Sequence, residues 1–217
     1  MTVEELEAKV KTLEAQVRTL QDIEEIKKLQ RAFGFYLEHW MSSEIIELFA
    51  DGPDTILSIA VGEFRGKDNI RQFCNRGKQG NEIMKHDKPE FLHQVMQLSG
   101  IVDIDPGGLT AKGRWYGFGA NALPAEGGIA PGWMNGVYEN EYVKEDGIWK
   151  FKVVRWCMTF NASFVNGWVD PSVRVDRRPQ PPYNSSTGFS PDGTPETTLY
   201  PSGFICPFHY KNPVSGK

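Results

Sequence analysis

Cysteines are scarce in this sequence, and their placement does not suggest a disulfide framework. Cys74, Cys157 and Cys206 are the three cysteines among 217 residues, an odd number at wide spacings. Disulfide-held domains of secreted proteins usually carry an even number of closely spaced cysteines. The pattern therefore favours reduced thiols and predicts a cytoplasmic protein.

Long apolar runs and an excess of positive charge are missing as well. No stretch approaches the roughly 20 apolar residues of a membrane-spanning helix, and the N-terminus is charged, unlike a signal peptide. The formal net charge is −4, and no basic patch contains interleaved aromatic residues. We therefore expect neither membrane insertion nor nucleic-acid binding.

Motifs for metals and cofactors do not occur either. No pair of His and carboxylate residues has metal-ligand spacing. Neither a phosphate-binding glycine loop, nor a dinucleotide fingerprint, nor a Gly-x-Ser-x-Gly elbow is present. Cys157 lies within a strand pattern, where a small buried residue is commoner than a nucleophile. We predict chemistry that needs no metal and no cofactor.

What the sequence does contain is a pair of long strand patterns between Gly132 and Phe160, joined by a turn at Asp146-Gly147. Strands of this length require a curved sheet with something packed inside, so we expect the chemistry in a cavity there. A period of two gives the first strand two faces. One carries Met134, Gly136, Tyr138, Asn140 and Tyr142, and the other Trp133, Asn135, Val137, Glu139 and Glu141.

Further strands and connections are expected upstream of this hairpin. They are a short strand at 55–61 with a return through 62–66, a mobile lid loop at 77–90, long strands at 92–104 and 109–123, and a Gly/Pro loop at 124–131.

The N-terminal residues show a heptad pattern. Valine and leucine alternate along the seam, which favours two parallel helices, and Lys9 and Glu14 lie where a parallel partner would pair them. We predict self-association as a dimer, with a trimer as an open alternative; a helix lying on its own domain is the other interpretation. The seam residues are Val3, Leu6, Val10, Leu13, Val17 and Leu20.

Three more helices are predicted before the long strands. The first continues from Ile23 to about Trp40 with a changed phase, and its Gly34 permits close approach of a neighbour. The second begins near Ser42 and Ser43 as caps, and the third runs from 69 to 76 with Asp68 as its cap.

The chain therefore divides into three predicted parts. Residues 1–22 form an oligomerisation helix, residues 23–164 form the central domain, and residues 165–217 form an extended Pro-rich arm. The arm contains too many apolar residues for a solvated tail, so we expect it to wrap its own domain or a neighbour. A homo-oligomer held by the N-terminal helix and this arm is the predicted assembly.

Four local patterns together resemble the SnoaL-like branch of the nuclear transport factor two-like superfamily. They are EEIKKLQRAFGFYLEHW with ELFAD, then FRGKDNIRQF, then LHQV with TAKGRWY, and finally ENEYVKEDGIWKF. The resemblance implies an α+β fold, in which a cone-shaped, curved, mainly antiparallel mixed sheet wraps around helices and leaves one deep pocket. The length, aromatic-rich strands and tail are also similar to those of bacterial lyases that release formaldehyde from lignin-derived diarylpropane diols.

The superfamily includes scytalone dehydratase, ketosteroid isomerase and polyketide cyclases, which use acid–base groups and no cofactor. By resemblance to scytalone dehydratase, Tyr36 matches a helix tyrosine and His93 a strand histidine. The position of the second histidine of scytalone dehydratase falls near Asn121 in this sequence, and the position of its asparagine falls near Tyr138. His93, Tyr138, Tyr36 and Asn121 are therefore the predicted catalytic residues, with His93 as base or acid because imidazole titrates near neutral pH.

Further side chains are predicted to bind a small aromatic substrate. Trp115 and Tyr116 point to opposite faces, so one of the two would line a cavity. Arg155 is expected at a surface or interface, His86 in the lid, and His209 in a structural role. The predicted binding residues are Trp115, Tyr116, Asn140, Met134, Trp156 and His39.

The predicted function is that of a cofactor-independent lyase acting on a small phenolic compound. Its product would be formaldehyde plus a stilbene, formed from a diarylpropane diol through a quinone methide. A dehydratase, isomerase or cyclase of a phenolic or polycyclic substrate, and a non-catalytic ligand-binding module, are the alternatives.

Overall fold

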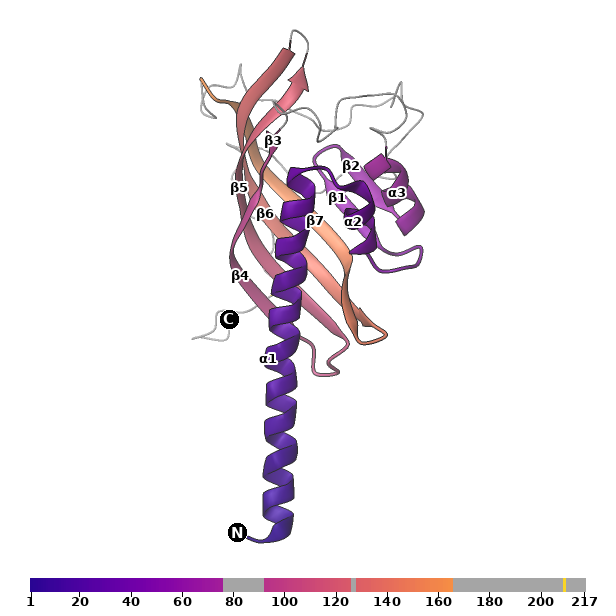
Figure 1. The fold of residues 1–217 in the computed structure, drawn as a ribbon, viewed down its shortest axis with the longest axis vertical. Helices are drawn as coiled ribbons and strands as arrows, with labels where there is room; N and C mark the ends of the chain where they lie inside the picture. The colour runs from indigo at the N-terminus through magenta and orange to yellow at the C-terminus, as the bar shows by residue number, and fades with distance from the viewer. Residues whose placement is uncertain (76–91, 126–127, 166–208, 210–217) are drawn as a thin grey trace.

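The computed structural model describes residues 1–75, 92–125, 128–165 and 209, and their fold is the predicted α+β cone (Figure 1). The strand order is β2-β1-β7-β6-β5-β3, and β4 also pairs with β5. The β1–β7 pair is parallel and the others are antiparallel, so the sheet is mixed. The elements are α1 (Val3–Glu38), α2 (Ser42–Glu47), β1 (Ile56–Ile59), β2 (Gly62–Arg65), α3 (Lys67–Asn75), β3 (Leu92–His93), β4 (Met96–Ile104), β5 (Thr110–Ala125), β6 (Gly128–Glu145) and β7 (Ile148–Ser163).

The predicted hairpin is confirmed as β6 and β7, which turn through Asp146 and Gly147 at φ 49° and 80°. The predicted loop at 124–131 is wrong, because β5 and β6 stay paired as far as Ala125 opposite Gly128. Backbone pairing across this hairpin outweighed the Gly and Pro content on which the loop prediction rested.

Two β-bulges decide which side chains of β7 point inward. The register of β6 against β7 shifts between Glu141 and Tyr142, and again between Asn135 and Gly136. Each shift places one extra residue on β7, so the alternation of faces reverses there. Phe151 and Val154 are consequently both fully buried although they are an odd number of residues apart.

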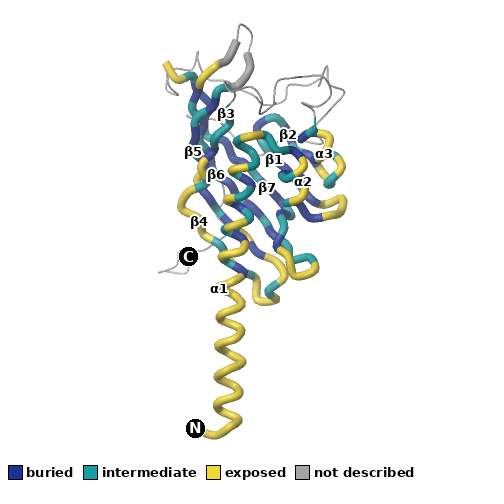
Figure 2. The backbone as a smooth tube through the Cα atoms, in the orientation of Figure 1, coloured by how far each residue is buried: buried dark blue, intermediate teal, exposed yellow. Residues whose placement is uncertain are grey.

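Helix α1 is a single continuous helix, so the helical segment predicted from Ile23 follows the N-terminal one without a break. Its two parts nevertheless differ in burial (Figure 2): Val3–Gln21, here called the stalk, is exposed throughout, and burial begins at Asp22. We call Asp22–Glu38 the anchored segment. The change of hydrophobic phase coincides with the point where the helix meets the sheet. The backbone stays helical across this point because the residues there favour a helix.

Smaller differences concern helix starts and one strand. The N-cap of α2 is Met41 and not a serine; the Ser42 hydroxyl instead donates to the Cys74 carbonyl oxygen at 2.8 Å. Helix α3 begins at Lys67, so Asp68 lies in its first turn and not at the cap. The strand predicted at 92–104 is divided into β3 and β4, and β4 contains an irregularity around Ser99, whose φ is 52°.

A buried polar cluster lies between α1 and the sheet, toward the stalk. The Gln30 Oε1 atom accepts hydrogen bonds from Asn140 Nδ2 at 2.9 Å and from the Tyr142 hydroxyl at 2.8 Å. The Tyr142 hydroxyl accepts in turn from Trp115 Nε1 at 3.0 Å. We call Gln30, Asn140, Tyr142 and Trp115 the buried polar cluster; its hydrogen bonds join the helix to β5 and β6.

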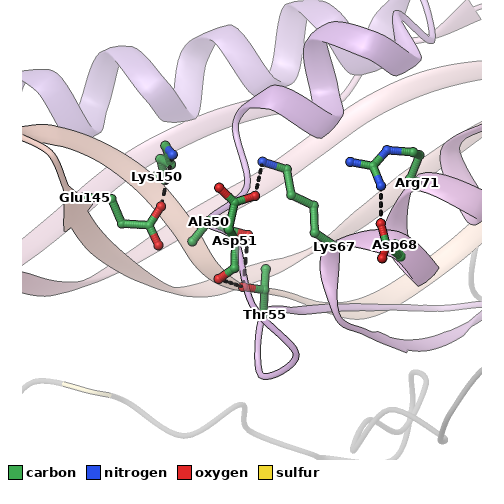
Figure 3. A network of polar contacts seen from close by, with 8 residues as sticks. All are labelled: Ala50, Asp51, Thr55, Lys67, Asp68, Arg71, Glu145 and Lys150. Carbon is green, nitrogen blue, oxygen red and sulfur yellow. Dashed lines mark hydrogen bonds and ion pairs between the residues drawn. The ribbon is translucent and has the colours of Figure 1, made fainter.

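Polar contacts also fix the connection between α2 and β1 (Figure 3). The Thr55 hydroxyl donates to the Ala50 carbonyl oxygen at 3.1 Å, and Asp51 forms an ion pair with Lys67 of α3 at 2.9 Å. The backbone of Ala50 donates to the Phe151 carbonyl oxygen at 2.9 Å. These contacts tie the segment that follows α2 to β7 and to α3. Ile45 of α2 and Phe73 and Cys74 of α3 line the cavity described below.

Part of the prediction lies outside the described residues, including the lid loop at 77–90 with His86 and nearly all of the arm. Within the arm, His209 is described, and its side chain is buried. Its Nδ1 contacts the Glu139 carboxylate, and its Nε2 lies 3.3 Å from Asp103 Oδ2. Glu139 also pairs with Arg114 at 2.8 Å, so His209 meets a charged group on the outer face of β5 and β6.

Candidate active site

A cavity of about 120 Å³ lies between the end of α1, helices α2 and α3, and the inner face of the sheet. An engineered apolar cavity of ~150 Å³ binds benzene, so this slightly smaller space is close in size to one aromatic ring and too small for two. Most of its lining is aliphatic or aromatic. The lining residues are Phe33, Leu37, Trp40, Ile45, Leu57, Ile59, Ala60, Val61, Phe73, Cys74, His93, Val95, Met134, Tyr138, Trp156, Met158 and Asn161.

Trp40 enters the cavity from an unusual backbone conformation at the end of α1. Its φ is 50°, and Met41 N donates to the Tyr36 carbonyl oxygen at 2.9 Å, which closes the helix in a Schellman-type turn. Glycine usually occupies that position, and a left-handed L-residue costs about 1–2 kcal/mol. A bond from Trp40 Nε1 to the Cys74 carbonyl oxygen at 2.9 Å holds the indole against the cavity.

His93 lies at the end of β3 and lines the cavity beside Trp40. The two rings are 6.1 Å apart between centroids and tilted by 60°. Residue 93 pairs with Asn121 across β3 and β5, so the resemblance-based position of a second histidine is occupied by an amide directly opposite His93. The cavity therefore contains one imidazole among the described residues.

Tyr138 comes from the inner face of β6 and packs in an edge-to-face contact with Phe33, with ring centroids 6.2 Å apart, and beside Trp156 at 4.5 Å. Burial raises the pKa of the Tyr138 phenol above its usual range, although a hydrogen bond with Gln97 acts in the opposite direction. Tyr138 is therefore protonated at neutral pH and can donate a hydrogen bond to a ligand oxygen.

Glycines make this arrangement of side chains possible. A Cβ on Gly34 would lie 2.7 Å from Gln97 Oε1, so glycine lets α1 approach the residue that contacts Tyr138, as predicted. A Cβ on Gly117 of β5 would lie 2.2 Å from the ring of Trp156. The missing side chain on β5 is thus replaced by a neighbouring indole, which forms part of the cavity wall.

Asn161 contributes a third polar group, which the sequence analysis missed. Strict alternation from Met158 predicts Phe160 inside and Asn161 outside, but the bulge at the end of β7 reverses the faces. Asn161 is buried and lines the cavity, while its Oδ1 lies 3.5 Å from Asn121 Nδ2. Asn121 therefore lies behind Asn161 and supports it.

The structure brings together four of the ten predicted site residues: His93, Tyr138, Met134 and Trp156 all line the cavity. Trp115 and Asn140 are buried but belong to the buried polar cluster. Tyr116 is 59% exposed because it points to the outer face of β5. His39 is exposed at the end of α1, and Tyr36 and Asn121 are outside the lining. The predicted positions of these six in the cavity are corrected accordingly.

Sequence signals for the missed lining residues were weak. Nothing in the sequence indicates that Trp40 adopts a left-handed conformation. Gly136 of β6 lies at the register shift that turns Asn161 inward, and a Cβ there would lie 2.5 Å from the Cys157 carbonyl oxygen. A glycine within a strand can mark a bulge, but it does not show which strand carries the extra residue. Phe73 and Cys74 lie on the apolar face of α3, but a helical stripe does not reveal whether it covers a core or a cavity.

Within the described part of the chain, no three His, Cys, Asp or Glu side chains come together in a way that could hold a metal ion. None of the described helices is both long and apolar enough to cross a membrane.

Comparisons with known proteins agree with this architecture. A family model described as a SnoaL-like domain matches residues 18–155. A provisionally named scytalone dehydratase from Novosphingobium aromaticivorans has a TM-score of 0.53 at 19% identity, over 72% of this chain and 96% of that chain. A hexachlorocyclohexane dehydrochlorinase, LinA-type3 from Novosphingobium barchaimii, has a TM-score of 0.52 at 17% identity, over 72% and 99%. These identities establish a shared fold. No curated protein matches the sequence.

Proposed function

This chain belongs to the family of SnoaL-like domains, and we propose that it is a cofactor-independent lyase for a small phenolic aromatic compound. The observation that carries the proposal is the cavity itself, in which His93 and Tyr138 are set into an otherwise apolar wall. A few polar groups within an apolar pocket are typical of small-molecule sites. The solved relatives named for dehydration and dehydrochlorination support an elimination chemistry in the same fold.

The finer proposal is the cleavage of a lignin-derived diarylpropane diol. The para-phenol pushes out the benzylic hydroxyl group, which leaves as water, and a quinone methide forms. A base then removes the proton of the neighbouring hydroxymethyl group. The carbon–carbon bond breaks, formaldehyde leaves, and the electron pair forms the stilbene double bond and restores the phenol. Diol thus becomes stilbene, formaldehyde and water, with no oxidant or reductant required.

His93 acts as the base in this proposal, because a neutral imidazole can take the hydroxymethyl proton at neutral pH. Tyr138 donates a hydrogen bond to the departing hydroxyl or to the phenolic oxygen of the substrate, as its protonated state allows. Asn161 offers an amide to the same ligand from the neighbouring strand, β7. Trp40 and Trp156 supply flat apolar surfaces for the aromatic ring.

The size of the cavity limits how a two-ring substrate can bind. The space of about 120 Å³ suits one ring. We propose that the phenolic ring enters the cavity and that the second ring lies outside the described lining. Single-ring phenols would then compete with the diol for the cavity. Compounds whose ring system is larger than a single ring would not fit the cavity and would not compete.

The histidine can be tested by substitution with a matched control. His93→Ala should lower the rate of stilbene and formaldehyde release by roughly 10²–10⁴-fold, the range for one general acid–base group. His39→Ala removes an exposed imidazole at the C-terminal end of α1, outside the cavity lining, and should leave the rate unchanged. Thermal unfolding of both variants checks that they fold. Wild-type turnover in folded His93→Ala would remove His93 from the mechanism.

Product analysis of the same assay tests the reaction type. Formaldehyde together with a stilbene supports the lyase. Loss of water alone from the diol would instead indicate a dehydratase, the alternative favoured by the likeness to a protein named for scytalone dehydration. An amide at Asn121, where that resemblance places a second histidine, speaks for the one-base lyase.

A further inference from the structure

We propose that the stalk of α1 is a docking surface for the stalk of a second copy of this chain, in a parallel two-stranded coiled coil. The inference concerns an interaction surface and is independent of the proposed reaction. The stalk extends away from the sheet as a bare helix (Figures 1 and 2). Its seam side chains are between 46% and 72% exposed; they are Val3, Leu6, Val10, Leu13, Val17 and Leu20.

The orientation of the seam argues against coverage by the chain's own sheet. Successive residues of an α-helix are rotated by about 100°, so the seam lies roughly 170° around the helix from the core face of the anchored segment. That core face is marked by Ile26, Gln30 and Phe33, which are buried against the sheet. A straight helix cannot turn both faces to the same sheet, so the seam points away from it.

Charge favours a parallel partner over an antiparallel one. In a parallel pair, Lys9 lies beside Glu14 of the partner subunit, which is a favourable contact. An antiparallel pair brings equivalent flanking positions together and would place Glu7 beside Glu14 of the partner subunit, which is repulsive. Valine at one seam position and leucine at the other favours two strands over three.

The stalk and the anchored segment form one continuous helix. Thr2 and Glu5 form a capping box at its first turn, and the anchored segment holds its other end on the sheet. Isolated helices of about three heptads are marginal because nucleation is costly. Here the anchored segment, which packs on the sheet, already nucleates the helix. The free energy of association therefore comes from burying the seam and is not spent on nucleating the helix.

The parallel arrangement has a geometric consequence for the cavities. Because the core faces point away from the partner, the two sheets lie on opposite sides of the coiled coil. The cavity is lined by Phe33 and Leu37 near the C-terminal end of α1. Both cavities of the dimer therefore lie at the end away from the stalk, and neither is covered by the coiled coil.

The assembly can be measured on the full chain by light scattering after size-exclusion chromatography. We expect a mass of twice the 24.5 kDa of the chain. Leu13→Glu places a charge in the seam and should raise the dissociation constant by on the order of 100-fold, since two leucine side chains lose their burial. Ala15→Glu adds the same charge on the outer face of the same turn and should leave the dimer intact.

The direction of the helices needs a separate measurement. Leu20→Cys should give a disulfide-linked dimer on mild oxidation, because residue 20 meets its own counterpart in a parallel pair, and wild-type protein treated identically is the control. In an antiparallel pair, residue 20 would instead meet residue 3. A monomeric or trimeric wild type, equal masses for Leu13→Glu and Ala15→Glu, or no crosslink beyond the wild-type level would each overturn the proposal.

Discussion

Tyr138 and Tyr142 lie four residues apart on the same face of β6, and their surroundings are opposites. Both are buried, and burial raises the pKa of each phenol. The Tyr142 hydroxyl is enclosed in the buried polar cluster, where it donates to Gln30 and accepts from Trp115. Tyr138 lines the cavity instead. Burial and a raised pKa therefore do not identify a functional tyrosine by themselves; access to an empty space does.

Of the changes that test this comparison, the largest effect is expected at Tyr138. Tyr138→Phe removes a hydrogen-bond donor from the cavity while keeping the ring, so turnover of a phenolic substrate should fall by about 10²-fold. The free energy of unfolding should change by no more than about 1 kcal/mol, because Gln97 keeps its bond to the Val95 carbonyl oxygen. Steady-state kinetics and urea unfolding measure the two quantities. A large loss of stability with unchanged turnover would assign Tyr138 a structural role.

The matching change at Tyr142 should produce the converse. Tyr142→Phe leaves the Gln30 oxygen and the Trp115 N–H each without one buried partner, which costs about 1–3 kcal/mol of unfolding free energy. The turnover of the folded variant should equal that of the wild type. If both phenylalanine variants lowered turnover equally, the distinction between cluster and cavity would be wrong.

A smaller, pH-dependent effect is expected at Asp22, on the stalk side of the buried polar cluster. Burial alone would raise the pKa of Asp22, but hydrogen bonds from Lys144 and Trp149 and the charge of Lys144 outweigh it and lower the pKa. Since the folded pKa lies below the unfolded one, the stabilisation is present above about pH 4 and is lost as pH falls through the folded pKa.

Asp22→Asn should therefore lower the unfolding free energy by about 1–2 kcal/mol at pH 7 and by much less at pH 3. Urea unfolding at the two pH values measures the difference. A deficit of the same size at both would show that the charge of Asp22 does not stabilise the fold.

Sequence alone predicted most of the architecture, because the β6–β7 hairpin and the apolar helix faces follow simple periods. Where the backbone departs from those periods, the sequence was misleading. The bulge near Thr159 moved Asn161 into the cavity, and the left-handed turn at Trp40 did the same for an indole. No glycine or proline marks the turn at Trp40, and Gly136, which faces the bulge from β6, does not show that the extra residue lies on β7.

Site prediction was weaker for the same reason that separates the two tyrosines. Alternation correctly placed Met134, Tyr138, Asn140 and Tyr142 on one inner face, but it does not state how far the helix fills the space behind that face. Gln30 reaches down from α1 and occupies the space beside Asn140 and Tyr142. Where α1 ends, the same face borders the cavity.

The most direct test of the cavity as an active site is a crystal structure with a para-substituted phenol soaked into it. We predict the ring between Trp40 and Trp156, with an oxygen of the ligand within the roughly 2.6–3.2 Å of a hydrogen bond to Tyr138 or His93. A cavity that stays empty at saturating phenol, or a ring bound elsewhere on the molecule, would contradict the proposed site.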